Sequence, residues 1–134
     1  MRLVIDANIL FAALIKNGLT RKIICNDRIE LFAPKFLQEE MLKYIIYIEQ
    51  KAKIPNIYII TKELLSTITF IQDDQLKDHW SLANDISADI KDTAYVATAL
   101  ALNYPLWSND KTLKRIENIK VLNTTEVVEL IEQQ

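Results

Sequence analysis

The stretch LVIDANIL, residues 3–10, joins an apolar run to a polar turn and then to a second apolar run. Its first part has no polar alternation, which is typical of a parallel strand buried on both faces. We therefore predict a strand over residues 2–5 that ends at Asp6. From Asn8 the letters ILFAALI continue as a buried helix that stops near Gly18, because glycine favours a helix end.

The same alternation of strand and helix continues along the chain. Further strands are predicted at residues 30–34, 67–71, 105–107 and 120–122. Helices are predicted between and after them: a short one that carries Ile23 and Ile24, then residues 34–51, 56–66, 74–86, 92–102, 109–116 and 124–133. The β-branched residues of 56–66 favour a strand, but their apolar spacing also fits a helix, which is the interpretation adopted. The alternation predicts a three-layer α/β/α domain with a central parallel sheet.

Several helix boundaries depend on single residues. Thr20 is expected to cap the short helix, Pro34 to open the long one, and Thr124 or Thr125 to cap the last. The segment 74–86 is expected to form one amphipathic helix. Its apolar side would carry Leu76, Trp80 and Ala83.

Composition limits the classes of protein to consider. The chain has 134 residues, half of them apolar, and only one glycine and three prolines, so residues 1–134 are expected to form a single domain without a flexible linker. The net charge of −2 argues against binding nucleic acid mainly through a basic surface. A single cysteine, Cys25, excludes an internal disulfide and is expected to be a buried thiol. With no apolar run long enough for a membrane span or signal peptide, a cytoplasmic protein is expected.

Four acidic residues occupy positions where a carboxylate needs a partner. Asp6 and Asp110 follow apolar runs that predict strands, and in parallel sheets ligands bind beyond the carboxyl ends of the strands. Glu40 and Asp92 lie in helical segments that are otherwise strongly apolar. Oxygen ligands from aspartate and glutamate suit Mg²⁺ or Mn²⁺.

Each acid also has a purely structural interpretation. Asp6 or Asn8 could cap the first helix, Asp89 could cap the helix that contains Asp92, and Asp110 or a neighbour could cap the next. Glu40 is harder to explain in this way, since it lies at the edge of an apolar helix face, whereas Glu39 points nearer to solvent.

Other chemistries find no support in the sequence. One glycine excludes a dinucleotide fingerprint and a Walker loop, and no cysteine or histidine spacing fits zinc. The lone histidine, His79, is expected to be a surface residue. Carboxylates therefore dominate the candidate chemistry, which favours metal-assisted hydrolysis.

Three segments together resemble the motif series of the PIN domain family. They are LVIDANIL, APKFLQEEMLKY and KDTAYVATALALNYPLWSNDKTL, and the resemblance covers about residues 2–131. It implies a parallel sheet with helices on both faces and an acidic pocket that binds Mg²⁺ or Mn²⁺. The metal-binding and catalytic acids it implies are Asp6, Glu40, Asp92 and Asp110.

Residues close to these acids are expected to orient them or to bind substrate. Ser108 and Asn8 are expected to orient the carboxylates by hydrogen bonds. Four cations close in sequence to the acids could hold flanking phosphates, or could be solvated surface residues: Lys91, Lys111, Lys114 and Arg115.

The resemblance implies a metal-dependent endoribonuclease that hydrolyses RNA, and it suggests the toxin of a toxin–antitoxin pair with a protein antitoxin as partner. A homodimer is also expected from the family, with Tyr47 or residues 57–60 as candidate contacts. Two alternatives remain. A catalytically silent PIN-like module would bind RNA or protein, while a dehalogenase-like phosphatase would require a second aspartate where Asn8 stands.

Overall fold

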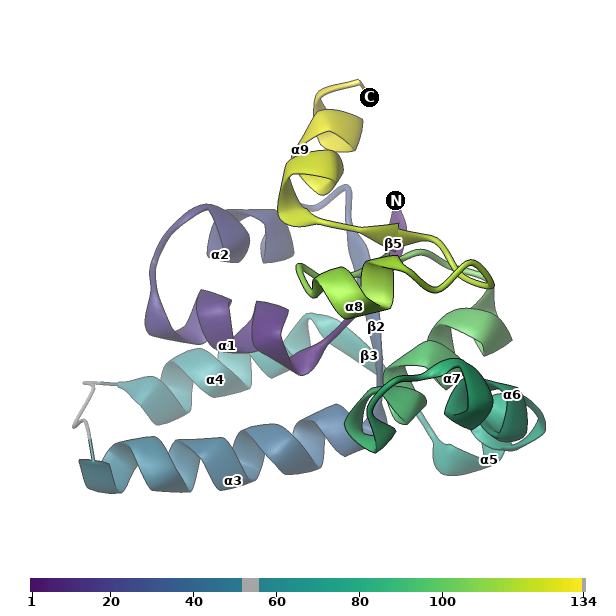
Figure 1. Ribbon diagram of the computed structural model, residues 1–134. Helices are drawn as coiled ribbons and strands as arrows, with labels where there is room; N and C mark the ends of the chain where they lie inside the picture. The colour runs from purple at the N-terminus through teal and green to yellow at the C-terminus, as the bar shows by residue number, and fades with distance from the viewer. Residues whose placement is uncertain (52–55, 134) are drawn as a thin grey trace.

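A computed structural model describes residues 1–51 and 56–133 as a five-stranded, all-parallel sheet between two groups of helices (Figure 1). The strand order is β3-β2-β1-β4-β5. The strands are β1 (Arg2–Ile5), β2 (Glu30–Pro34), β3 (Ile68–Ile71), β4 (Leu106–Trp107) and β5 (Val121–Leu122). The predicted three-layer α/β/α class is confirmed.

Helices cover both faces of the sheet. On one side of it (Figure 1) lie α1 (Ala7–Ile15), α2 (Leu19–Ile24), α3 (Lys35–Lys51) and α4 (Ile57–Ser66). On the other lie α5 (Asp73–Leu76), α6 (Trp80–Ile86) and α7 (Thr93–Leu102). The 3₁₀ turns η1 (Lys77–His79) and η2 (Ile90–Asp92) precede α6 and α7, and the carboxyl-terminal part adds α8 (Lys111–Lys114) and α9 (Thr124–Glu132).

The order in which the chain adds strands to the sheet reverses between β1 and β4. From β1 the chain continues to β2 and β3 on one side, while β4 and β5 pair on the other side. The register aligns Ile5 with Trp107, so the residues that follow these two strands emerge side by side. In open α/β sheets such a switch point is where ligands bind.

Several predicted boundaries were wrong. Pro34 is the last residue of β2 rather than the first of α3, and Gly18 rather than Thr20 is the N-cap of α2. The last helix is capped by Asn123, whose side chain accepts a hydrogen bond from the Glu126 amide while Glu126 bonds back to the Asn123 amide. This capping box satisfies two amides at once, which a threonine one or two residues later would not do.

The segment 74–86 is not one helix. It is divided into α5, η1 and α6, all of which contact α7. A bent path lets Leu76 and Ala83 both reach the core, whereas Trp80 is 45% exposed. The prediction failed because helical spacing alone does not reveal a 3₁₀ turn.

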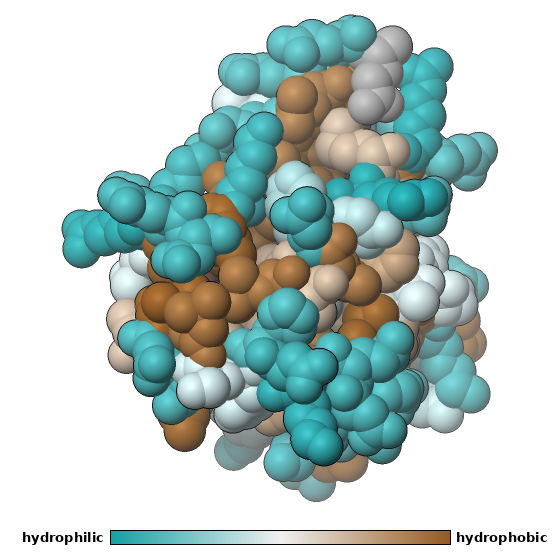
Figure 2. Space-filling model, turned by 90° about the vertical axis from the view of Figure 1, so that its right-hand side faces the viewer, coloured by the Kyte–Doolittle hydropathy of each residue, from teal (hydrophilic) through white to brown (hydrophobic). Residues whose placement is uncertain are grey.

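The surface combines charged residues with exposed apolar ones. Figure 2 shows apolar side chains interrupting the hydrophilic surface on the face that lies to the right in Figure 1. Cys25 is exposed, contrary to expectation, because it follows the last turn of α2. Of the suggested dimer contacts, Tyr47, Tyr58 and Ile59 are exposed, whereas Ile57 is buried. Within the described part of the chain, no helix has both the length and the apolar character that crossing a membrane requires.

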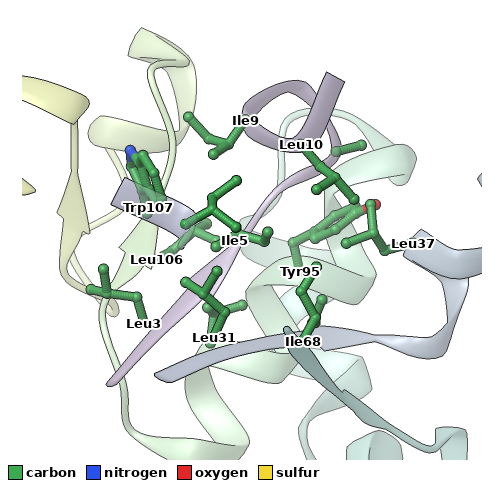
Figure 3. Close-up of a cluster of buried hydrophobic side chains, with 14 of the residues drawn as sticks. Leu3, Ile5, Ile9, Leu10, Leu31, Leu37, Ile68, Tyr95, Leu106 and Trp107 are labelled. Atoms are coloured by element: carbon green, nitrogen blue, oxygen red, sulfur yellow. The ribbon is translucent and has the colours of Figure 1, made fainter. Parts of the chain in front are cut away.

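The core is continuous from one face of the sheet to the other. It contains side chains of the central strands, of α1 and α3, and of α7 (Figure 3). Residues Thr93 to Ala99 of α7 are all buried, which confirms the prediction of a central, closely packed helix with small side chains. Helix α7 contacts β1, β2 and β4, so it packs against the centre of the sheet.

Candidate active site

Asp6 is the first residue after β1, and it is 7% exposed. Its Oδ1 accepts a hydrogen bond of 3.0 Å from the Ile9 amide, so it caps α1. Its Oδ2 accepts a short hydrogen bond from the Ser108 hydroxyl. The capping interpretation and the site interpretation are therefore compatible, because the cap fixes the carboxylate at the carboxyl edge of the sheet.

Ser108 connects the two central strands. It follows β4 directly, is fully buried, and accepts a 3.1 Å hydrogen bond from the Asp110 amide while it donates to Asp6. Asp110 in turn caps α8 through a 2.8 Å bond from the Thr112 amide to its Oδ1. The predicted hydrogen bond from Ser108 to an acid is present. Asn8 lies beside these acids, in the lining of the cleft described below. None of the described hydrogen bonds joins its side chain to an acid.

Glu40 comes from the second turn of α3. Its Oε1 accepts a 2.6 Å hydrogen bond from the hydroxyl of Tyr95, which lies on α7 and is 4% exposed. Glu39, its neighbour, lines a different groove together with Trp80. Glu40, at the edge of the apolar helix face, is therefore the glutamate that lies with the other acids.

Asp92 is at the junction of η2 and α7. Asp89 caps η2 by accepting a 2.9 Å hydrogen bond from the Lys91 amide, whereas the Asp92 side chain makes no capping bond. The carboxylate of Asp92 is therefore available to the space in front of it.

These elements enclose one cleft of about 490 Å³. Its lining is mostly polar, and all four predicted acids belong to it. The lining residues are Asp6, Ala7, Asn8, Phe11, Glu40, Ala88, Asp89, Lys91, Asp92, Tyr95, Asp110 and Thr112. The structure therefore brings together acids that are up to 104 residues apart in the sequence, since 110 − 6 = 104.

The acids affect one another electrostatically. Desolvation, followed by the negative charges of Asp110, Asp89, Asp6 and Glu40, raises the pKa of Asp92 to about 6. Burial also raises the pKa of Asp6, although its hydrogen bonds from Ser108 and Ile9 act in the opposite direction. Concentrated negative charge of this kind is relieved by protons or by cations.

The donor set of the cleft fits a hard divalent cation. Four carboxylates offer oxygen ligands, which Mg²⁺ and Mn²⁺ prefer. As the side chains lie, however, no three acidic, histidine or cysteine side chains among residues 1–51 and 56–133 are grouped closely enough to hold an ion.

The predicted phosphate-binding cations are distributed unequally. Lys91 lines the acidic cleft. Lys114 does not, because its ammonium donates to the Val121 carbonyl at 2.8 Å and pairs with Glu126. Arg115 lines a separate hollow with Ile116, and Lys111 is exposed on α8. Of the four, Lys91 lies in the cleft lining, whereas Lys114 is paired with Glu126.

Sequence reasoning missed Tyr95. A tyrosine in the small-residue run TAYVATALAL, three residues after Asp92, was the available signal. Asp92 directly precedes α7 and Tyr95 lies three residues later, so the two side chains are expected on the same side of the start of the helix.

Comparison with known proteins gives the family. A search of curated proteins found no match. Among solved structures, the chain is similar to the crystal structure of VapBC2 from Rickettsia felis bound to a DNA fragment from their promoter. The TM-score is 0.72 at 18% sequence identity, and the match covers 92% of this chain and 98% of that one. A family model described as the PIN domain matches residues 4–130. The chain belongs to the PIN domain family.

Proposed function

We propose that this protein is a Mg²⁺- or Mn²⁺-dependent endoribonuclease. Its metal-binding and catalytic residues would be Asp6, Glu40, Asp92 and Asp110. The observation that carries this proposal is the convergence of these four carboxylates on one cleft at the carboxyl edge of a parallel sheet. Membership of the PIN family supports nuclease chemistry over other uses of an acidic cleft.

The chain's own side chains would bind and orient the reactants. Ser108 holds Asp6 in place, and the backbone amides of Ile9 and Thr112 orient Asp6 and Asp110. Lys91, which lines the cleft, would contact a phosphate of the substrate. When bound, a divalent ion supplies positive charge that polarises the scissile phosphate and makes water more acidic.

The direct test is cleavage of single-stranded and structured RNA in the presence of Mn²⁺ or Mg²⁺. Asp6→Asn and Asp110→Asn should each reduce cleavage at least about 100-fold, which corresponds to roughly 2.7 kcal/mol of lost transition-state stabilisation. Asp85→Asn is the matched control, because it makes the same chemical change at an exposed residue of α6 outside the cleft. This variant should retain activity. Cleavage that survives both substitutions, or excess EDTA, contradicts the mechanism.

We also propose that the protein is the toxin of a toxin–antitoxin pair and acts on RNA in the cytoplasm. The similarity to VapBC2 over most of both chains supports this assignment. Expression of the wild-type chain should arrest growth, and Asp6→Asn should not. Growth restored by a small protein encoded beside it would identify the antitoxin. A chain that cleaves RNA but is harmless when expressed would instead be a housekeeping nuclease.

A catalytically silent PIN-like module is the competing function, and the absence of a ready-made ion site among the described residues favours it. Thermal unfolding distinguishes the two. A ligand at 100 times its dissociation constant stabilises the native state by about 2.7 kcal/mol. Mn²⁺ should therefore raise the melting temperature of the nuclease, whereas a module without a metal site should be unaffected.

A further inference from the structure

Tyr95 is a buried polar side chain whose hydroxyl is directed at a cleft acid. Its ring belongs to the cluster of buried residues in Figure 3, and its hydroxyl donates to Glu40 Oε1 at 2.6 Å. Hydrogen bonds from a hydroxyl to a carboxylate are short and stronger than neutral ones. An ionised carboxylate has only acceptors, so the direction of this bond is fixed.

The ring of the donor is buried and packs on α3. The Tyr95 ring packs edge-on against Phe36, with ring centroids 6.4 Å apart and an angle of 60° between the planes. Phe36 lies one turn before Glu40 on α3, so both the ring and the hydroxyl of Tyr95 contact the same helix. A hydroxyl fixed in this way is a suitable anchor for a flexible partner.

Glu40 is such a partner. It is half-buried, whereas Met41 and Leu37 on the same helix are fully buried. A long glutamate side chain at the edge of an apolar face has many rotamers available, and ordering it costs entropy. The hydrogen bond to Oε1 selects the rotamers directed at the cleft and leaves Oε2 for a further ligand.

Helix α7, which carries Tyr95, is also preceded by a cleft acid. Asp92 precedes α7 and Tyr95 lies three residues later, so both are on the side that lines the cleft. Thus the junction of η2 and α7 provides one carboxylate, and α7 orients the carboxylate of Glu40 on α3 through Tyr95.

We propose that Tyr95 is a positioning residue that orients Glu40 for divalent-ion binding. The proposal rests on the metal-dependent function proposed above. Residues that hydrogen-bond to metal-binding side chains typically change metal affinity 10- to 100-fold when mutated. Tyr95 therefore acts on the ion only through Glu40.

Mn²⁺ titration of the full chain, with free Mn²⁺ followed by its electron paramagnetic resonance signal, measures this effect. Tyr95→Phe should weaken Mn²⁺ binding about tenfold. Tyr44→Phe is the matched control, since it removes the same atom from a half-buried tyrosine on α3 whose ring packs on Phe11. It should bind Mn²⁺ like the wild type. Equal or tighter binding by Tyr95→Phe overturns the proposal.

A double-mutant cycle separates positioning from a general structural effect. In a Glu40→Ala background, Tyr95→Phe should change the Mn²⁺ affinity less than about twofold, because the group it orients is absent. An undiminished tenfold loss in that background would mean that Tyr95 acts by another route, and would overturn the proposal.

The cleavage reaction gives an independent readout. In Tyr95→Phe, the Mn²⁺ concentration for half-maximal cleavage should rise about tenfold, while the rate at saturating Mn²⁺ stays within about twofold of the wild type. A lower rate at every Mn²⁺ concentration, with an unchanged half-maximal concentration, would contradict positioning.

Should Tyr95→Phe fail to fold, fluorine NMR of the wild-type sequence labelled with 3-fluorotyrosine replaces it. The chain has five tyrosines, so the Tyr95 resonance is assigned by replacing the other four singly. It should shift on addition of Mg²⁺, and the Tyr44 resonance should not. Failure of the wild type to bind Mn²⁺ or Mg²⁺ overturns both proposals, whereas normal binding with an unshifted Tyr95 resonance overturns the positioning role alone.

Discussion

The carboxylate of Asp6 has a hydrogen bond at each oxygen, one from the Ile9 amide and one from Ser108. Asp6 therefore stabilises the fold and also lines the cleft. The cap begins α1 and the serine ties β1 to β4, and both constraints point the carboxylate in one direction. The structural interpretation of each acid is therefore part of how the site is built.

Ser108→Ala should destabilise the protein by about 1–3 kcal/mol, because it removes a donor from buried Asp6 and an acceptor from the Asp110 amide. Urea unfolding measures the loss. Ser66→Ala provides a comparison, since its hydroxyl donates to the Glu63 carbonyl at an exposed site, and it should cost less than about 0.5 kcal/mol. Equal effects of the two substitutions would mean that the bonds of Ser108 add little stability.

Asp92→Asn should stabilise the metal-free protein at neutral pH. The folded-state pKa of about 6 lies above the ordinary value of 3.8, so the folded state binds the proton more tightly than the unfolded one. The stability contributed by this proton is fully present below about pH 4 and is lost as the pH rises through 6. With allowance for solvent screening in the open cleft, the gain at pH 7.5 should be about 1 kcal/mol.

Urea unfolding in EDTA at pH 7.5 and pH 4 tests this sign. The gain from Asp92→Asn should disappear at pH 4, where the wild-type carboxylate is protonated as well. Asp85→Asn on α6 should change the free energy of unfolding by less than about 0.5 kcal/mol at both pH values. A destabilising Asp92→Asn at pH 7.5 would show that the charge of Asp92 is not under repulsion.

At the scale of elements, helix ends are where sequence and structure disagree most. Thr124 and Thr125 are both reasonable caps by residue type, but Asn123 occupies the position and Glu126 completes a capping box with it. Thr124 has other partners, because its amide and hydroxyl both bond to Asn109. The loop after β4 is thereby anchored to the start of α9.

Asn123→Ala should cost about 1 kcal/mol of stability, because the Glu126 amide loses its partner. Thr125→Ala, at an exposed position in the first turn of α9, should cost less than about 0.5 kcal/mol. Thermal and urea unfolding of both variants measure the difference. The reverse order of effects would favour the cap that the sequence suggested.

Over the whole molecule, the fold was predictable because buried parallel strands have a clear sequence pattern. Runs such as LVI and ELFAP carry no polar alternation, and each is followed by a helical pattern, so the strand–helix order could be established. Two of the four cleft acids could be predicted for the same reason. Asp6 and Asp110 follow strands, and parallel strands end at one edge of the sheet.

What the sequence did not reveal depends on contacts between distant segments. The bond between Tyr95 and Glu40 joins residues 55 apart, and no local pattern reports such a pairing. The three parts of the segment 74–86 each contact α7, and helical spacing within the segment does not report these contacts. Lys114 is close to Asp110 in sequence but pairs with Glu126, so sequence distance was a poor guide to where its side chain lies.

The most direct test of the four-acid account is a crystal structure with Mn²⁺, in which anomalous scattering locates the ion. A Mn²⁺ peak is expected in the cleft, with oxygen atoms of Asp6 and of at least two of Glu40, Asp92 and Asp110 within about 2.5 Å. A crystal at saturating Mn²⁺ with no peak in the cleft, or with Mn²⁺ bound only to other surface acids, would contradict it.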